Sequence, residues 1–174
     1  MEAMKVFIIA AITADGFIGR DATHLANWTS KEDKQLFVKL TKEAGTMVMG
    51  ARTFDTIGRA LPGRRTIVYT THPEKYRDLG VDRTNRDPKE LVAQVEKERG
   101  KALAVCGGAQ VYDLFLQSGV VTDLYLTIEP ILFGTGIPLF KTAIEQTLKL
   151  EELKQLNEHT VLVHYKLGSR HAQS

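Results

Sequence analysis

The chain has 174 residues, of which 43% are hydrophobic and 25% charged. This is the mixture of an ordinary soluble globular protein, and the length predicts a single domain, residues 1–174, with one core. The formal net charge is +2, so the chain lacks the strong basic bias of nucleic-acid-binding domains. No apolar run approaches the roughly 18 residues of a membrane span. We therefore expect neither a nucleic acid nor a membrane as partner.

The sequence contains one cysteine, Cys106, which cannot form a disulfide within the chain. Neither this cysteine nor a signal-like segment points to secretion, so we expect a cytoplasmic protein. Short polar ends, at 1–3 and 168–174, are expected to be flexible.

The first half of the chain predicts alternating strands and helices. Residues 5–13 form a nearly continuous apolar run, which is typical of a strand covered on both faces. Thr29 or Ser30 is expected to begin a helix that ends at Gly45. The other elements expected here are a strand at 46–49, a helix at 50–57, a turn at 61–64 and a strand at 65–71.

The second half continues the alternation. It predicts a helix from Asp87-Pro88 to about Arg99, a strand at 102–106, a helix from 108 to 119, and strands at 122–128 and 160–167. This order favours an α/β three-layer sandwich with a mostly parallel central sheet and flanking helices. The last strand follows a long connection, so we expect it to be antiparallel and at the sheet edge.

Two glycine-opened helix starts are candidate phosphate sites. Gly107-Gly108 joins a strand to a helix, where free N–H groups suit an anion, although a tight turn explains the glycines equally well. Gly50 opens a second such junction, and Arg52 and Thr53 follow it; a solvated arginine and a helix cap are the alternative. Together the two junctions could hold the halves of a dinucleotide.

Asp33 and Arg64 are candidate ligands for a substrate. Ser30-x-x-Asp33 resembles a capping box, which is the commoner role of such an acid. The functional alternative is a buried carboxylate that binds a heterocycle, with Phe37 one turn later on the same face. Arg64 could grip a carboxylate, or it could be a surface residue beside Arg65.

Cys106 lies at the end of a buried strand with no histidine near it in the sequence, so we expect an inert thiol. The five histidines show no metal-ligand spacing, and we predict no metal site.

Four blocks of the sequence, in order, resemble the dihydrofolate reductase family. They are IAA at 9–11 with Ile18-Gly19; Trp28 with Asp33, Phe37 and Thr41; MGARTFDTIGRALPGR at 49–64; and CGGAQVY at 106–112 with LYLT at 124–127. The resemblance covers most of the chain. It implies a twisted, mostly parallel sheet with an antiparallel last strand, and NADPH as cofactor.

The resemblance implies reduction of 7,8-dihydrofolate to 5,6,7,8-tetrahydrofolate, with a hydride delivered to C6 and a proton delivered to N5 through water. In this comparison Asp33, backed by the hydroxyl of Thr127, binds and orients the pterin, and Trp28 helps to order a water molecule; these three are the expected catalytic residues. The implied substrate-binding residues are Ile9, Ala11, Asp33, Lys34, Phe37, Ile57, Leu61, Arg64, Cys106, Tyr112 and Thr127.

The resemblance also implies a cofactor site in which Gly107 and Gly108 are joined by a cis bond. Ala51 and Gln110 stand where family members often carry arginines for the cofactor 2′-phosphate, a role that Arg52 could take. The implied cofactor-binding residues are Ala11, Ile18, Gly19, Gly50, Ala51, Arg52, Thr53, Thr70, Thr71, Cys106, Gly107, Gly108, Ala109, Gln110, Val111 and Tyr112.

The segment 129–140, EPILFGTGIPLF, is more similar to the related reductases of riboflavin biosynthesis, which share fold and cofactor but reduce a ribosylated pyrimidine. The loop between Gly19 and Trp28 is also longer than in familiar bacterial members. A pyrimidine reductase and a non-catalytic nucleotide-binding module are therefore the alternatives. We expect dihydrofolate as the small-molecule substrate and a monomer in preference to a homodimer.

Overall fold

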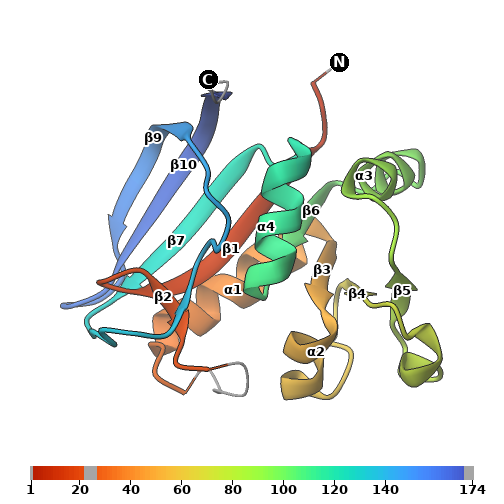
Figure 1. Ribbon diagram of the computed structural model, residues 1–174, viewed down its shortest axis with the longest axis horizontal. Coiled ribbons are helices and arrows are strands. Elements are labelled where there is room, and N and C mark those ends of the chain that lie inside the picture. Colours follow the sequence, from red (N-terminus) through yellow and green to blue (C-terminus); the bar gives the residue numbers. More distant parts are fainter. Residues whose placement is uncertain (1, 22–26, 171–174) are drawn as a thin grey trace.

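The computed structural model describes residues 2–21 and 27–170. A sheet of eight strands forms the centre, in the order β5-β4-β3-β6-β1-β7-β10-β9 (Figure 1). Its strands are β1 Lys5–Thr13, β3 Thr46–Gly50, β4 Arg65–Tyr69, β5 Asp82–Thr84, β6 Ala102–Val105, β7 Asp123–Glu129, β9 Gln146–Gln155 and β10 Val161–Arg170. A two-stranded sheet joins β2 Phe17–Gly19 to β8 Ile137–Pro138. The helices are α1 Lys31–Ala44, α2 Ala51–Ile57, η1 Pro73–Tyr76, α3 Pro88–Lys97 and α4 Ala109–Ser118.

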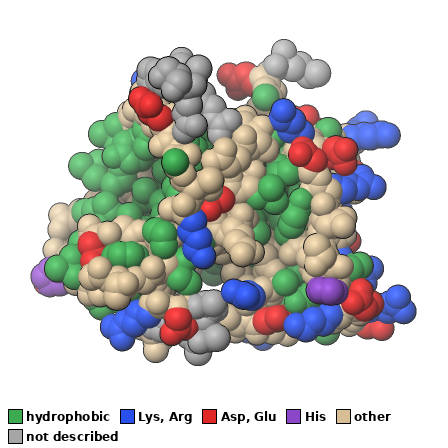
Figure 2. Space-filling model, viewed as in Figure 1, with side chains coloured by type: hydrophobic (Ala, Val, Ile, Leu, Met, Phe, Trp, Pro, Cys, Tyr) green, Lys and Arg blue, Asp and Glu red, His purple; other side chains and the backbone are tan. Residues whose placement is uncertain are grey.

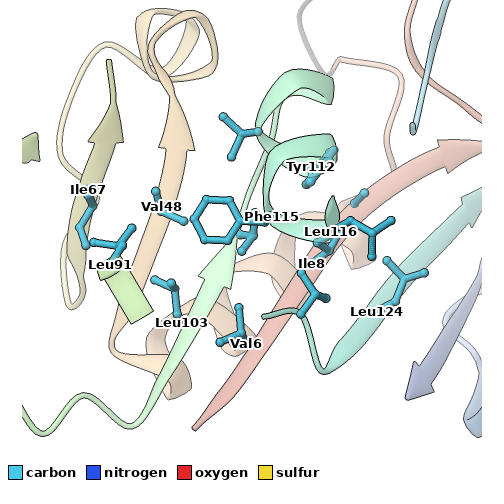
Figure 3. Packing of buried hydrophobic residues seen from close by; sticks show 14 of the residues in the cluster. Val6, Ile8, Val48, Ile67, Leu91, Leu103, Tyr112, Phe115, Leu116 and Leu124 are labelled. Atoms are coloured by element: carbon cyan, nitrogen blue, oxygen red, sulfur yellow. The ribbon is translucent and has the colours of Figure 1, made fainter. Parts of the chain in front are cut away.

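Helices cover both faces of the sheet and divide the core in two. Along β1, Val6 and Ile8 belong to the cluster under α3 and α4, whereas Phe7 and Ile9 belong to the cluster under α1 and α2. Phe115 of α4 is fully buried on the first of these faces, among side chains from several strands (Figure 3). The continuous apolar run of β1 is explained by this burial on both sides. The predicted three-layer α/β sandwich is confirmed.

The helix boundaries follow local signals that the sequence contains. Ser30 caps α1 through its side chain, and Gly45 ends that helix with φ 78°. Gly119 ends α4 in the same left-handed conformation, which glycine adopts without steric cost. Asp87 caps α3, with Pro88 at its first position. That helix ends at Lys97, two residues before the predicted end near Arg99.

The last strand is antiparallel to β7, as predicted, but the prediction that it forms the sheet edge was wrong. A further strand, β9, pairs antiparallel with β10 on its outer side. The predicted flexible end also began too early, because β10 continues to Arg170. Residues 171–174 lie outside the described part of the chain. The strand expected at 65–71 ends at Tyr69.

Strand β9 carries an exposed apolar side. Leu148, Leu150 and Leu153 are 42%, 53% and 65% exposed. Leu150 pairs with Tyr165 and Leu153 with Val163, because the register shifts between these two pairs. Because of this shift, Leu150 and Leu153 lie on the same face of the sheet, whereas simple alternation would place them on opposite faces. Figure 2 shows apolar side chains gathered over this part of the molecule.

Candidate functional site

The carboxyl ends of three neighbouring parallel strands are tied together at one edge of the sheet. The amide of Gly50, the last residue of β3, donates to the carbonyl of Gly107, after β6, at 2.8 Å. The hydroxyl of Tyr112 on α4 donates to the carbonyl of Ile9 on β1 at 2.7 Å. In open α/β sheets ligands bind outside this edge. The predicted site residues of three sequence blocks therefore lie together here.

Asp33 projects from the first turn of α1 toward β7. Its side chain is hydrogen-bonded to the hydroxyls of Thr127 and Thr29. Burial raises the pKa of the Asp33 carboxyl above its usual value; the Thr127 hydroxyl opposes this, and the nearby carboxylate of Glu129 adds to it. The group is thus a carboxylic acid that keeps its proton to higher pH than an exposed aspartate does.

The helix α4 begins at the double-glycine turn, and the Gly107-Gly108 peptide bond is cis. No side chain caps this helix start. A Cβ built on Gly50 would lie 3.1 Å from Val111 Cγ2, and one on Gly108 would lie 3.4 Å from Thr53 Oγ1. The two strand–helix junctions therefore approach each other through glycines, and the helix start is left open for an anion.

Arg64 has one buried nitrogen without a partner. Its Nη1 donates to the carbonyl of Pro62 at 3.0 Å, whereas Nε is buried and makes no hydrogen bond to the described residues. Burial lowers the pKa of this guanidinium, partly opposed by its proximity to Cys106. A buried donor without an acceptor is unfavourable, so this nitrogen is suited to an acidic ligand group.

Cys106 is buried next to this edge. Its thiol contacts the carbonyl of Ala104 at 3.6 Å, and burial strongly raises its pKa. Tyr112 is also buried, and burial raises the pKa of its phenol well above the usual value. Neither group ionises readily, so each can line a site but is unsuited to act as a nucleophile.

The loop after β1 packs against the segment that follows β7. The Asp15 carboxylate accepts hydrogen bonds from the amides of Phe133 and Gly134, at 3.2 and 2.7 Å. The ring of Trp28 lies edge-on to Phe133, with 5.2 Å between centroids. Ile18 and Gly19 belong to β2, which pairs with β8. Residues 22–26 of the predicted longer loop lie outside the described residues.

The other predicted site residues differ in their surroundings. The side chains of Phe37, Ile57, Leu61 and Ala51 pack against the apolar cluster under α1 and α2. Thr70 is buried and accepts a hydrogen bond from the amide of His72. Exposed positions are Lys34, Arg52, Thr71 and Gln110.

Cavity size does not mark this region. A cavity of about 740 Å³ lies at the opposite edge of the sheet and is lined by Lys5, Asp123 and His164 among others. A second cavity of about 540 Å³ borders the region and is lined by Trp28 and Glu129. The hydrogen-bonded Asp33 and the open start of α4 mark the candidate site instead, because recognition depends on such polar groups.

Residues 2–21 and 27–170 contain no cluster of three or more potential metal ligands. No helix among these residues has both the length and the apolar character to cross a membrane.

The chain matches known proteins along most of its length. The family model for dihydrofolate reductase matches residues 5–147. Dihydrofolate reductase type A13 of Escherichia coli is 31% identical over 134 residues, which cover 74% of this chain and 76% of that protein. The uncharacterised protein YwjB of Bacillus subtilis is 24% identical over 170 residues, covering 92% of this chain and 97% of that protein.

Two solved structures illustrate both branches of the resemblance. A putative riboflavin biosynthesis protein from Shewanella has a TM-score of 0.78 at 19% identity, covering 95% of this chain and all 100% of that one. Dihydrofolate reductase from Enterococcus faecalis, complexed with NADP(H), has a TM-score of 0.71 at 25% identity, covering 95% and 97%. The fold and the strand-end site define an α/β protein of the reductase type. The chain belongs to the dihydrofolate reductase family.

Acidic groups near Asp33 include one that the sequence analysis missed. Glu129 follows Thr127 by two residues on β7 and is 2% exposed. A charged residue almost never lies this deep unless it is paired. The sequence signal that could have identified Glu129 is its position two residues after Thr127 in a strand, which places both side chains on the same face.

Proposed function

We propose that this protein reduces 7,8-dihydrofolate to 5,6,7,8-tetrahydrofolate with NADPH. The observation that carries the proposal is the Asp33 carboxyl, largely buried and hydrogen-bonded to Thr127 next to the strand-end site. A carboxyl group in this setting can pair with two adjacent N–H donors of a pterin. Membership of the dihydrofolate reductase family supports the same substrate.

The chain's own residues would orient and enclose the substrate. Asp33 would hold the pterin ring and favour its protonated form, while N5 takes its proton from water. Trp28, packed on Phe133, would help to place that water. The unpaired Nε of Arg64 would donate a hydrogen bond to the carboxylate of the substrate's glutamate tail. Fixed positions for both ends of the substrate lower the entropic part of the barrier.

The residues at the two glycine junctions fit a dinucleotide. The open start of α4 suits a phosphate, and a side chain at Gly50 would crowd Val111. Arg52 and Thr53, at the start of α2, would hold the cofactor's remaining phosphates. When bound, NADPH supplies the hydride that C6 receives.

A pyrimidine reductase of the riboflavin pathway is the second candidate. The segment 129–140 favours it, because this segment packs against the loop after β1 and would border the substrate. The Shewanella riboflavin biosynthesis protein shares the fold at a TM-score of 0.78, which does not distinguish substrates. A non-catalytic nucleotide-binding module is disfavoured by the hydrogen-bonded Asp33.

One assay separates these functions. Purified protein is mixed with NADPH and either dihydrofolate or the ribosylamino-pyrimidine, and NADPH oxidation is followed by absorbance. The proposal predicts turnover with dihydrofolate. Turnover with the pyrimidine alone would assign the second function, and NADPH binding without turnover of either compound would indicate a non-catalytic module.

A further inference from the structure

Glu129 is a buried acid that accepts three hydrogen bonds. One oxygen accepts from the backbone amide of Ser30 at 2.9 Å and from its hydroxyl at 2.7 Å. The other oxygen accepts from the hydroxyl of Thr160, just before the neighbouring strand β10, at 3.2 Å. The side chain is only 2% exposed, and burial of a carboxylate is unfavourable unless it is hydrogen-bonded. These donors therefore compensate for its desolvation. The contacts link β7 directly to the residue that caps α1.

The contacts of Glu129 take the place of one of the two hydrogen bonds that form a capping box. In a capping box the N-cap side chain accepts from the amide of the third helical residue, whose acidic side chain reaches back to the N-cap amide. Here Ser30 Oγ accepts from the Asp33 amide at 3.1 Å, which is the first half. The second half is made by Glu129, since the Ser30 amide donates to it. The Asp33 carboxyl is instead hydrogen-bonded to Thr127 and Thr29.

We propose that Glu129 is a positioning residue for Asp33. Because Glu129 on β7 accepts the hydrogen bond of the Ser30 amide, the Asp33 carboxyl stays directed at Thr127 and the substrate site. This inference rests on the proposed function for the role of Asp33 in turnover. It also gives a physical reason for a carboxylate at this depth, where an apolar side chain would be less costly.

The charge of Glu129 acts on Asp33 as well. The charged groups that influence Asp33 are Glu129 on β7, which raises its pKa, and Lys34 on α1, which lowers it. The phenol of Tyr112 on α4 is the third titratable group coupled to it. Burial of Asp33 is the largest cause of its raised pKa, and the Glu129 charge adds to that effect. Removal of the charge should lower the pH at which Asp33 titrates.

Two variants separate positioning from charge. Glu129→Gln keeps an oxygen that can accept from Ser30 but removes the charge, so the cap is retained. Glu129→Ala leaves the Ser30 amide without an acceptor, and the Asp33 carboxyl is then expected to turn back to it. Thr160→Val is the matched control, because it removes a Glu129 partner without affecting the cap. Circular dichroism and thermal unfolding establish that each variant is folded.

The first measurement is the titration of Asp33 by carbon NMR of labelled aspartate carboxyls, which needs no turnover. The midpoint is expected to be highest in the parent protein, lower in Glu129→Gln and lowest in Glu129→Ala. The second measurement is turnover of dihydrofolate. Glu129→Ala should lose about tenfold, as small misplacements do, while Glu129→Gln and Thr160→Val stay within about threefold.

The two measurements keep the inference distinct from the proposed function. If the parent protein does not reduce dihydrofolate, the proposed function fails, yet the NMR titration still tests the placement of Asp33. The inference is overturned if Asp33 titrates at the same pH in the parent and both variants. It is also overturned if Glu129→Ala and Glu129→Gln give the same midpoint, because charge alone would then account for the effect.

Discussion

The hydroxyl of Thr127 on β7 is hydrogen-bonded to the carboxyl of Asp33 on α1. Thr127 is 1% exposed and pairs with Ala11 of β1 on one side and Leu162 of β10 on the other. Thr127, the partner of the proposed pterin-binding acid, is therefore held in place by an interior strand of the sheet that is paired on both sides. A rigid support of this kind holds a reactive geometry more closely than a loop can.

Replacement of Asp33 by asparagine should stabilise the protein at pH 8. Burial raises the pKa of Asp33 in the folded state, so its stabilising contribution is present below the unfolded pKa and is lost as pH rises through the folded pKa. At pH 8 the ionised group opposes folding. Urea unfolding should show a gain of about 1 kcal/mol for Asp33→Asn. The gain should become smaller in mild acid. Equal stability of the variant and the parent protein at pH 8, or a lower stability of the variant, would contradict this prediction.

Arg64→Lys should weaken binding of dihydrofolate with little change in turnover at saturation. Lysine keeps the charge but cannot supply the buried Nε donor, so KM should rise about tenfold, the scale of one charged hydrogen bond. Arg65→Lys is the matched control, because Arg65 is paired with Asp82 and Glu98. Equal KM values for the two variants would argue against a tail-binding role for Arg64.

Gly50→Ala should weaken NADPH binding. The new Cβ would lie 3.1 Å from Val111 Cγ2, which is tight enough to push apart the two glycine junctions. Fluorescence titration is expected to show a loss of about tenfold in affinity, comparable to other packing changes at a binding site. The double variant Gly50→Ala with Val111→Ala removes that contact and should recover part of the loss. Unchanged affinity in the single variant would place the cofactor elsewhere.

The sequence predicted the elements that obey strong local rules. The buried run of β1, the Ser30 and Gly45 ends of α1, and the glycine-ended α4 were all expected and are observed. Each depends on hydrophobic periodicity or on a cap, which nearby residues determine. The cis bond at Gly107-Gly108 followed from the family resemblance and is present.

Strand β9 and Glu129 could not be predicted in this way. The sequence of β9, QTLKLEELKQ, is rich in Lys and Glu, which are depleted in strands, and only pairing with β10 makes it one. Glu129 acts on Ser30, which is distant in sequence, so its role depends on how β7 passes the start of α1. The short strands β2, β5 and β8 and the 3₁₀ helix η1 were also missed, because so few residues carry little pattern.

The proposed role of Asp33 is best tested by the turnover of dihydrofolate by the Asp33→Asn variant at neutral pH. Asparagine preserves the size of the side chain but cannot act as a carboxylic acid toward the pterin. If Asp33 binds and orients the pterin, kcat should fall by at least about a hundredfold, the usual scale for lost acid–base assistance, in a protein that remains folded. Turnover close to that of the parent protein would contradict the assigned role of Asp33.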